Sequence, residues 1–562
     1  MSSLNIIDGE CNVTKVPSSC YHSTQYQSKP SDGTSAIHSK MSDTQNQDHE
    51  SINVDDGSMY LSDAITKIGA YGRYQMLVHL LMVFASTAEV VSNLSAYLCG
   101  LPSPWVCKAG SKICISNMTH NSYDLSKCKM PRSEWEYTKS YYESFVVQFD
   151  LSCERQWMAQ MPTSIFYLGT MFGSLILGWI SDNYGKKKTL VPCYLTLCIA
   201  GCLVSISPNI WVLTGLRFIG GLCIPALSPN MGTMLSELVL PEHRSKVVVT
   251  MYLFWPFALS LLSVTAYVLP NWIWLSRVGS LPFLILLPAL SMVPESLTWL
   301  AAHGKIVDVK FALIKISNYN KKPLDQDISL KIPKVPKRSR KTKPTDLFCT
   351  MQMALSSLIQ GFMWFAVNMA YYGILLGSGD LSSGSVYLNF IYTSLVELPA
   401  VFAAYYALDK FGRKKSMIFC STFGAVGCCV ITAIPKYGSW HTVRLISGVI
   451  ARFFVCILYA GIIPWSIELY PTIIRSQGIG YAYAMGRIGC IASPWVINSM
   501  KMLHHIAPWA CLAFFLAMMA LSITHLPETK GRPLLTDIPG RQSFHMTDVD
   551  SSAETITNIN AN

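Results

Sequence analysis

The sequence predicts an all-α polytopic membrane protein in which twelve helices cross the bilayer as two sets of six. Three observations support this fold class: the composition, the length of the apolar runs and an internal repeat. Of the 562 residues, 51% are hydrophobic and only 14% are charged, whereas soluble domains carry about 25% charged residues. The apolar residues gather in runs of about twenty or more, the length of a membrane-spanning helix. A soluble globular enzyme is therefore excluded.

The apolar runs define the membrane spans one after another along the chain. Each run is long enough to cross the hydrocarbon core at about 1.5 Å of rise per residue. An even number of spans places both ends of the chain on the same side of the membrane. The predicted spans are 74–98, 158–181, 189–207, 211–235, 246–269, 276–293, 348–376, 385–408, 416–434, 442–465, 478–499 and 508–526.

Lysine and arginine indicate which side of the membrane the connections occupy. Five connections carry 22 basic residues together, whereas their short counterparts on the other side carry only Lys436 and Lys501. Basic residues remain on the cytoplasmic side, so we expect both termini in the cytoplasm. The net charge of +11 is then an orientation signal and predicts no nucleic-acid partner. The basic connections are 182–188, 237–246, 295–346, 409–415 and 466–477.

The spans divide the chain into five parts. The first part is rich in Ser, Asp, Asn and Gln and has neither the basic region nor the apolar core of a cleaved signal peptide, so we expect a disordered tail. In the central loop, 306–316 is predicted to form a short helix. The parts are a cytosolic N-terminal tail (1–73), a first half (74–293), a basic cytosolic loop (294–347), a second half (348–526) and a cytosolic C-terminal tail (527–562).

The one long external segment, 99–157, is predicted to be held together by disulfides. Several cysteines within about fifty residues of an extracellular segment are typical of a disulfide framework, although their spacing does not determine the pairing. The segment also contains Asn117-Met118-Thr119, an N-glycosylation sequence on the external side. The candidate disulfide cysteines are Cys107, Cys114, Cys128 and Cys153, with Cys99 at the edge of the segment.

An internal repeat relates the two sets of six spans. Three sequence features of the first half recur in the second at offsets of 227, 231 and 233 residues. Parallel six-helix halves joined by a cytoplasmic loop are typical of major facilitator transporters, whose substrate site lies at the midplane between the halves. The matched features are Asp182 to Lys188 with Asp409 to Lys415, Glu237 and Arg244 with Glu468 and Arg475, and Pro294-Glu295-Ser296 with Pro527-Glu528-Thr529.

The repeated motif combines a glycine with charges of both signs. Gly185 and Gly412 permit a tight turn between two helices, while the charges remain at the cytoplasmic interface. One interpretation is that the basic residues are only topological anchors. We predict instead a cytoplasmic gate of inter-helix salt bridges that holds the outward-facing state. Its members are Asp182, Glu237, Asp409 and Glu468 with Arg244, Arg413 and Arg475.

Several longer strings resemble solute carrier family 22, the organic cation, anion and carnitine transporters. The resemblance covers roughly 60–535 and implies a plasma-membrane transporter. The long polar N-terminal tail departs from the short start that is usual in the family. The strings are FDLSCERQW from Phe149, VPES from Val293, LVELPA from Leu395, ELYPTIIR from Glu468 and LPETKG from Leu526.

Four ionisable residues lie near the middle of predicted spans: Glu89, Glu397, Arg452 and Arg487. Such residues are costly in a membrane and mark functional sites, although two acids and two bases could also neutralise one another. The resemblance implies that an acid at Glu397 is typical of cation and carnitine carriers, whereas Arg at 487 is typical of anion and carnitine carriers. The Glu397 carboxylate would bind an amine, and the planar guanidinium of Arg487 would bind a carboxylate. The two residues together therefore suit a zwitterion.

Aromatic residues complete the predicted substrate site. Trp364 and Tyr371 are two turns apart on one helix face, and the resemblance implies that Phe254 and Tyr387 are also cavity residues. Aromatic rings attract quaternary ammonium groups, although packing against other helices or lipid would explain any one of these residues alone. Arg452 and Glu89 are further candidates, and the resemblance implies that Arg452 orients Arg487 or Glu468 rather than contacting substrate.

The sequence thus predicts a secondary transporter of small organic cations or zwitterions that works by alternating access. An organic anion exchanger is the alternative, and a receptor with a transporter fold but no flux is a third. We expect no enzymatic activity, no cofactor and no metal, since the chain has no Walker motif, dinucleotide fingerprint or nucleophile–base constellation. Its partners are a small organic ion and the lipid bilayer, while the coupling ion (Na⁺ or H⁺) and the oligomeric state are left open.

Overall fold

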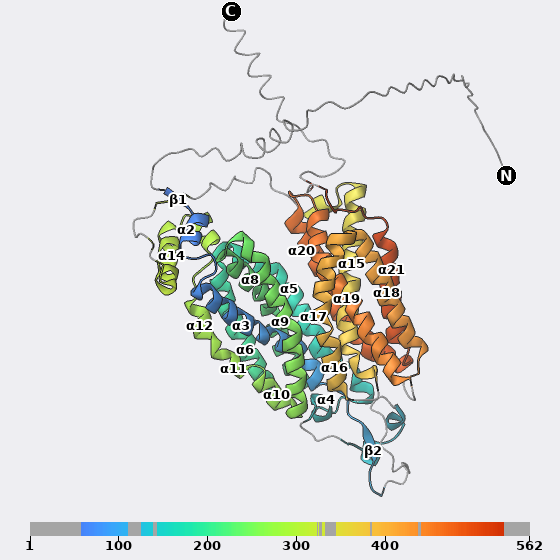
Figure 1. Cartoon of the computed structure of the whole chain (residues 1–562). Helices are drawn as coiled ribbons and strands as arrows, with labels where there is room; N and C mark the ends of the chain where they lie inside the picture. The colour runs from blue at the N-terminus through green and yellow to red at the C-terminus, as the bar shows by residue number, and fades with distance from the viewer. Residues whose placement is uncertain are drawn as a thin grey trace, which may run out of the picture. The chain divides into compact units, whose positions relative to one another are not determined.

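The computed structural model describes residues 58–110, 125–138, 143–322, 324, 329–331, 344–382, 385–435, 440–532 and 535. Within them the helices lie at the predicted spans and form two bundles, one coloured blue to green and the other yellow to red in Figure 1. The N-half consists of α3 (Arg73–Cys99), α5 (Met161–Tyr184), α6 (Lys186–Val204), α7 (Ile210–Cys223), α8 (Ser228–Glu237), α9 (Pro241–Val268), α10 (Trp272–Val278), α11 (Leu281–Leu284) and α12 (Leu286–Met292). The C-half consists of α15 (Met351–Leu376), α16 (Val386–Leu395), α17 (Glu397–Phe411), α18 (Arg413–Ala433), α19 (His441–Leu469), α20 (Arg475–Leu503) and α21 (Ala507–Ile523).

Three predicted spans are interrupted rather than continuous. The span predicted over 211–235 is divided into α7 and α8 by the short 3-10 helix η4 (Ile224–Ala226), which contains Pro225. The span predicted over 385–408 breaks between α16 and α17, where the ring of Pro399 obstructs the carbonyl of Leu395, four residues earlier. The span predicted over 276–293 consists of short helices. The break before α17 matters most, because it places Glu397 at a helix start.

Ten helices of the described chain are long and apolar enough to cross a membrane. The other two predicted spans are helical as well: α21 is shorter, at 17 residues, and α20, which carries Arg487, is not among the ten. Both pack inside the C-half, α20 against α15 and α21 against α18. The predicted all-α polytopic fold is confirmed.

The N-terminal tail and the central loop meet in the structure, which corrects part of the prediction. Residues 58–67 are ordered as β1 (Ser58–Tyr60) and α2 (Leu61–Lys67), so the predicted disordered tail to residue 73 is wrong for this portion. Strand β1 pairs in parallel with β4 (Ser329–Lys331). Burial and pairing hold this portion in place, because Ala64 and Ile65 lie in the core. Residues 1–57 lie outside the described part.

The central loop also contains helices. It begins with α13 (Leu297–Ala302) and α14 (Ile306–Asn320) and ends with the short 3-10 helix η5 (Pro344–Phe348). Helix α14 confirms the predicted helix at 306–316 and extends it. Its last residue, Asn320, accepts a hydrogen bond from the backbone N–H of Tyr74 (2.8 Å) and donates one to the carbonyl of Ile68 (2.9 Å). The side chain of Asn320 therefore ties α14 to the start of α3.

The segment after α3 carries the predicted disulfide framework in part. Cys128 and Cys153 are bonded to each other, and Cys107 is also disulfide-bonded. Cys99 is instead a free, buried thiol, because it is the last residue of α3 and lies within the bundle rather than in the external segment. Cys114 and Asn117 lie outside the described residues. The ordered elements here are β2 (Trp105–Cys107), η1 (Leu125–Lys129), η2 (Arg132–Glu134), β3 (Trp135–Tyr137), α4 (Phe145–Gln148) and η3 (Cys153–Gln160).

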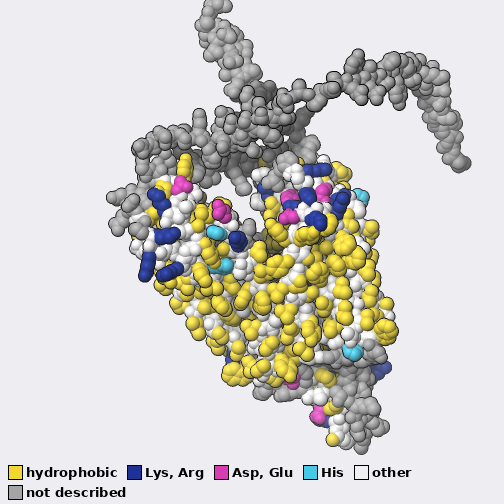
Figure 2. All heavy atoms as spheres, viewed as in Figure 1, with side chains coloured by type: hydrophobic (Ala, Val, Ile, Leu, Met, Phe, Trp, Pro, Cys, Tyr) yellow, Lys and Arg dark blue, Asp and Glu magenta, His cyan; other side chains and the backbone are white. Residues whose placement is uncertain are grey.

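The two ends of the helices differ in chemistry. We call the end with the α5–α6 and α17–α18 turns the basic end, and the end with the Cys128–Cys153 disulfide the disulfide end. Figure 2 shows hydrophobic side chains along the middle of the bundles and charged ones gathered in two clusters at the basic end, with the surface hollowed between the clusters. The halves pack mainly through α5 against α20 and α9 against α16.

Candidate functional site

Glu397 lies in a buried, charge-neutral cluster of the C-half. Its carboxylate is 6% exposed, forms an ion pair with Arg452 of α19, and accepts hydrogen bonds from the Tyr371 hydroxyl at 2.9 and 3.1 Å. The Arg452 guanidinium also covers the Tyr371 ring, 3.6 Å from its centroid, and donates to the Tyr371 carbonyl. The desolvated charges of Glu397 and Arg452 therefore compensate each other, as buried ions require.

One residue of the N-half contacts this cluster. The indole N–H of Trp255, on α9, donates to the Tyr371 hydroxyl at 3.1 Å. The same hydroxyl donates to Glu397, so a chain of hydrogen bonds runs from the N-half to the buried carboxylate. Trp255 was not predicted from the sequence, because the sequence does not distinguish a tryptophan that faces the substrate site from one that faces lipid.

Glu89 and Arg487 are arranged differently. Glu89, on α3, is 7% exposed and accepts a hydrogen bond from the Ser228 hydroxyl at the start of α8. Arg487, on α20, is partly buried, its Nε has no hydrogen-bond partner in the described structure, and it has no acidic partner at ion-pair distance there. Glu89 and Arg487 interact electrostatically although they belong to opposite halves.

Tyrosines surround Arg487. Tyr372, Tyr459 and Tyr483, together with Cys490, are near neighbours of its guanidinium. Tyr372 follows Tyr371 directly on α15, and the two rings lie 5.1 Å apart. The adjacent tyrosines 371 and 372 were visible in the sequence. Only Tyr371 was selected, because it lies two helical turns from Trp364 and Tyr372 does not.

The structure separates the predicted aromatic residues. Tyr371 lies in the Glu397 cluster. Trp364 is buried, donates to the Ser466 hydroxyl at 2.9 Å and lies against the Tyr483 ring at a tilted angle of 39°. Phe254 packs edge-on against Phe84 within the N-half. Tyr387 lies at the disulfide end, where it lines a cavity. The four therefore do not line one wall together.

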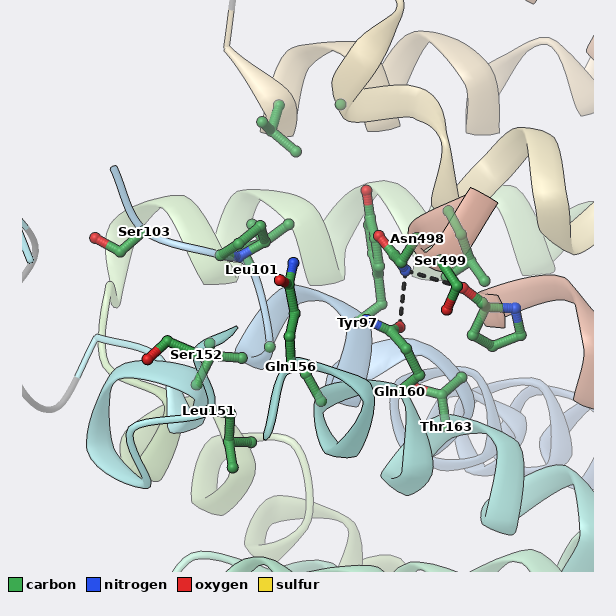
Figure 3. A pocket seen from close by; sticks show the side chains of 18 of the residues that line it. Tyr97, Leu101, Ser103, Leu151, Ser152, Gln156, Gln160, Thr163, Asn498 and Ser499 are labelled. Carbon is green, nitrogen blue, oxygen red and sulfur yellow. Dashed lines mark hydrogen bonds between the residues drawn. The ribbon is translucent and has the colours of Figure 1, made fainter. Parts of the chain in front are cut away.

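The cavity beside Tyr387 measures about 570 Å³ and lies between the halves at the disulfide end. Figure 3 shows Tyr97, Gln156, Gln160, Thr163 and Asn498 around it. The Asn498 amide donates to the Gln160 side-chain oxygen at 2.7 Å, which joins α20 to the residue before α5. The halves are thus connected by a neutral hydrogen bond beside the cavity.

Two further hydrogen bonds connect the halves near the disulfide end. The Ser164 hydroxyl of α5 donates to the carbonyl of Ile491 on α20, and the Ser263 hydroxyl of α9 donates to the carbonyl of Tyr387 on α16, both at 2.9 Å. Within the described part of the chain, these three bonds between the halves join uncharged groups.

At the basic end the N-half motif forms a network around one glycine. Gly185 has φ +115° and ψ +148°, a conformation open to glycine almost alone, and an added Cβ would lie 2.4 Å from the carboxylate of Glu295. That carboxylate accepts the backbone N–H of Lys187 at 2.8 Å, at the start of α6. The Lys186 ammonium pairs with Glu237 at 2.8 Å, and Ser296 donates to the same carboxylate.

The C-half repeats this arrangement. Gly412 has φ +91°, and Glu528 accepts the backbone N–H groups of Arg413 (2.9 Å) and Lys414 (3.0 Å). Burial raises the pKa of Glu528, but the backbone hydrogen bonds outweigh it and hold the pKa below its usual value. The Arg413 guanidinium pairs with Glu468 at 3.0 Å.

In this conformation the members of the predicted gate have the following partners, and the salt bridges expected in the outward-facing state stay a prediction. Glu237 pairs with Lys186, which was not among the predicted members, because Lys186 starts the helix that packs against α8. Arg244 donates to the carbonyl of Ser236, and Arg475 to the carbonyl of Tyr470 and the hydroxyl of Thr472. Asp182 contributes its backbone carbonyl, which accepts the Trp299 indole N–H at 2.7 Å. Arg413 also lies 3.8 Å from Asp409.

Two helical halves with charges buried between them define a membrane transporter rather than an enzyme. Residues 109–536 match the sugar (and other) transporter family. The fold is similar to the partially occluded inward open conformation of the E. coli xylose transporter, with a TM-score of 0.55 and 16% identity over 82% of this chain and 100% of that one.

Curated relatives narrow the family. An organic cation/carnitine transporter 4 of Arabidopsis thaliana is 26% identical over 86% of this chain and 91% of its own length. Solute carrier family 22 member 2 of Rattus norvegicus is 29% identical over 70% of each chain, and a carcinine transporter of Drosophila melanogaster is 27% identical over 80% of this chain and 67% of its own. The chain therefore belongs to the sugar (and other) transporter family and, within the major facilitator superfamily, to solute carrier family 22. The family predicted from the sequence is confirmed.

Proposed function

We propose that this transporter moves small organic cations or zwitterions across the plasma membrane, with both termini in the cytoplasm. The observation that carries the proposal is the set of buried charges at mid-helix, in which Glu397 lies against Tyr371 and Arg452 while Glu89 lies near Tyr372 and Arg487. Carboxylates and aromatic rings recognise amines, and a guanidinium recognises a carboxylate. The relatives named for organic cations, carnitine and carcinine support an amine-bearing substrate.

The sequence-based assignment places the ammonium group on Glu397 and the substrate carboxylate on Arg487. Tyr371 and Arg452 hold the Glu397 carboxylate in a fixed orientation. For Glu397 to bind an ammonium group, its ion pair with Arg452 has to loosen, so substrate and Arg452 would compete for the same carboxylate. Such competition is one way in which binding can be coupled to a change of conformation.

Alternating access is supported by where the halves are joined. Apart from the Trp255–Tyr371 bond in the central cluster, the described hydrogen bonds between the halves lie toward the disulfide end, whereas the ion pairs of the repeated motif lie within each half. This arrangement fits a conformation open toward the basic end, which we assign to the cytoplasm. In the outward-facing state, the two motif networks approach each other and serve as the cytoplasmic gate.

Glycosylation of Asn117 would test the orientation. The sequence-based proposal places this residue outside the cell, so the expressed protein should run faster on a gel after glycosidase treatment, and an Asn117→Gln variant should not change. A wild-type protein at the cell surface with no glycosidase-sensitive shift would contradict glycosylation of Asn117 in the expressing cell.

An organic anion exchanger is the second candidate, favoured by the lack of an ion-pair partner for Arg487 among the described residues. Uptake of labelled tetraethylammonium, carnitine and an aryl carboxylate by expressing cells separates the candidates. Our proposal expects uptake of carnitine or tetraethylammonium. Uptake of the aryl carboxylate alone would establish the anion exchanger, and surface expression without uptake of any probe would contradict both.

A further inference from the structure

Helix α14 presents an apolar face that the rest of the described chain does not cover. Val307 and Phe311 are 79% and 72% exposed. Together with the half-buried Ile314 they follow one side of the helix at spacings of four and three residues, and we call these three residues the outer face of α14. Apolar side chains left in water are unfavourable, so this face suits an apolar partner. The opposite side packs into the N-half through Val309, Ala312, Leu313 and Ile316.

Lysines flank the outer face on both sides. Residues 305–322 contain five lysines and a single acid, Asp308. At about 100° of rotation per residue, Lys310 and Lys315 lie on opposite sides of the outer face. Figure 2 shows dark-blue side chains where Figure 1 places α14. An exposed apolar stripe between lysines is typical of a helix that lies in the interface of a membrane with anionic headgroups.

The position of α14 brings this face to the end of a membrane span. The Lys315 ammonium donates to the carbonyl of Met292 at 2.9 Å. Met292 is the last residue of α12 and of the apolar span Trp272–Met292. Along this span Ile285 and Met292 are 78% and 65% exposed, as expected of side chains that face lipid. Helix α14 therefore lies where the span leaves the membrane and meets the headgroups.

We propose that the outer face of α14 binds anionic phospholipids of the cytoplasmic leaflet. Val307 and Phe311 enter the headgroup region, and Lys310 and Lys315 pair with phosphate groups. An ammonium group carries three donors, so Lys315 can bind a phosphate and keep its bond to Met292. The cytoplasmic leaflet carries the anionic lipids, so the choice of leaflet, though not of lipid, rests on the proposed orientation.

Lipid bound at α14 acts on the first span as well. The Asn320 side chain, at the end of α14, accepts from the backbone N–H of Tyr74 and donates to the carbonyl of Ile68. It joins α14 to the start of α3, and the two helices pack against each other. A lipid that holds α14 therefore also holds the start of α3, so its binding should raise the unfolding temperature of the transporter.

The test titrates phosphatidylserine or phosphatidylcholine into the purified full chain in detergent and follows the unfolding temperature. The wild type should respond at lower concentrations of phosphatidylserine than of phosphatidylcholine. Each lysine at the membrane surface adds to the affinity for anionic lipid, so Lys310→Gln/Lys315→Gln should lower the apparent affinity for phosphatidylserine by about tenfold or more. The matched control, Lys108→Gln/Lys129→Gln, removes two exposed lysines of the disulfide end and should keep the wild-type affinity.

A photo-reactive side chain locates the contact. The full chain with Phe311→benzoylphenylalanine is placed in nanodiscs that contain both lipids and is then irradiated. We expect adducts with phospholipid, in which phosphatidylserine exceeds its share of the bilayer. The same replacement at Ile285, on α12, should form phospholipid adducts without this enrichment, because no lysine pair flanks that position.

The outcomes separate lipid binding from transport. Equal responses of the wild type to the two lipids, or equal losses in the two double variants, would overturn the inference. Adducts at position 311 without enrichment of phosphatidylserine would overturn it as well, and adducts with protein in place of lipid would assign the outer face to a protein partner. None of these measurements uses a transport substrate. A failure of carnitine and tetraethylammonium uptake would therefore contradict the proposed function and leave lipid binding at α14 standing.

Discussion

The two ends of the bundles use different chemistry for different tasks. Toward the disulfide end, uncharged groups join one half to the other, through Gln160 with Asn498 and Ser164 with Ile491. At the basic end, the ion pairs of the motifs join helices of the same half. A neutral hydrogen bond contributes only about 1 kcal/mol and is easily exchanged, whereas a network of charge-assisted bonds holds its geometry better. The halves are thus loosely joined to each other and firmly braced within themselves.

This difference changes the interpretation of the repeated motif. The sequence suggests a cytoplasmic gate of inter-helix salt bridges in the outward-facing state. In the present conformation the motif fixes the turn between two helices and the start of the second one. Glu295 and Glu528 each accept backbone N–H groups at that start. A half that keeps its shape can rotate as a unit, which alternating access requires.

The largest expected effect comes from the glycines of the basic end. Gly185→Ala or Gly412→Ala would force a Cβ into a glycine-only conformation, at 2.4 or 2.6 Å from a carboxylate oxygen. The backbone strain alone costs about 1–3 kcal/mol, so we expect a strong loss of folded protein at the cell surface, measured by surface labelling and by the unfolding temperature in detergent.

A matched control is Gly215→Ala on α7, where an added Cβ meets nothing within 4 Å. This variant should fold like the wild type. Equal losses for Gly215→Ala and Gly412→Ala would show that the motif turn has no special role.

Next in size is the loss of one carboxylate from the motif. Glu468 accepts three hydrogen bonds from the Arg413 fork, whereas Glu237 receives one from Lys186. Glu468→Gln should therefore lower the unfolding temperature more than Glu237→Gln, and reduce uptake. Because these groups are partly solvated, the cost is about 1–2 kcal/mol.

Asp182→Asn provides the comparison, because the Asp182 carboxylate has no ion pair in the described structure, and its contact with Trp299 uses the backbone. It should leave the unfolding temperature nearly unchanged. If it is as destabilising as Glu468→Gln, the bracing network has been assigned to the wrong residues. Normal uptake by both variants would remove the motif from the proposed gate.

A smaller effect is expected at the disulfide end. Gln160→Leu, Asn498→Leu and the double variant form a cycle that measures the hydrogen bond between the halves, with an expected coupling of about 1 kcal/mol. Breaking this bond should favour opening at the disulfide end, measured as faster labelling of a cysteine placed at Ser499, which lines the cavity there. Unchanged labelling in all three variants would contradict a closing role for this bond.

The smallest predicted effect is a pH dependence at the basic end. The folded pKa of Glu528 lies below its usual value because backbone N–H groups stabilise the carboxylate against the effect of burial. Its contribution to stability is therefore complete above the unfolded pKa of about 4.3 and is lost as the pH falls through the folded pKa. The unfolding temperatures of the wild type and Glu528→Gln should differ at pH 7 and converge below about pH 4.

An exposed carboxylate of the disulfide end, Glu154, provides the control. Glu154→Gln should match the wild type throughout the same pH range. A constant difference between the wild type and Glu528→Gln at every pH would argue against the backbone hydrogen bonds as the source of the effect.

The sequence was sufficient for the fold because its signals are local. Apolar length defines each span, and the repeat of Gly185 at Gly412 relates the halves. The site was harder to predict, since its members are brought together by tertiary packing. Nothing near Glu397 in the sequence indicates that it binds Arg452 and Tyr371. The sequence also does not indicate that Trp255 of the other half donates a hydrogen bond to the Tyr371 hydroxyl.

The Lys186–Glu237 ion pair at the basic end was missed for a similar reason. The predicted gate combined its acids with arginines and did not include Lys186. The packing of α6 beside α8 brings Lys186 to Glu237, 51 residues away in the chain. Sequence spacing predicts which residues are neighbours on one helix. It does not predict which of several lysines or arginines from different helices will pair with a given carboxylate.

The bond between Asn320 and Ile68 has a consequence for the order in which the protein is made. These residues are 252 positions apart in the chain, and a ribosome adds about 5–20 residues per second. The start of α3 therefore emerges roughly 13 to 50 seconds before the side chain that secures it. During this interval the first helix must enter the membrane by its own hydrophobicity. The hydrogen bond that holds the start of α3 can form only after the whole N-half has been synthesised.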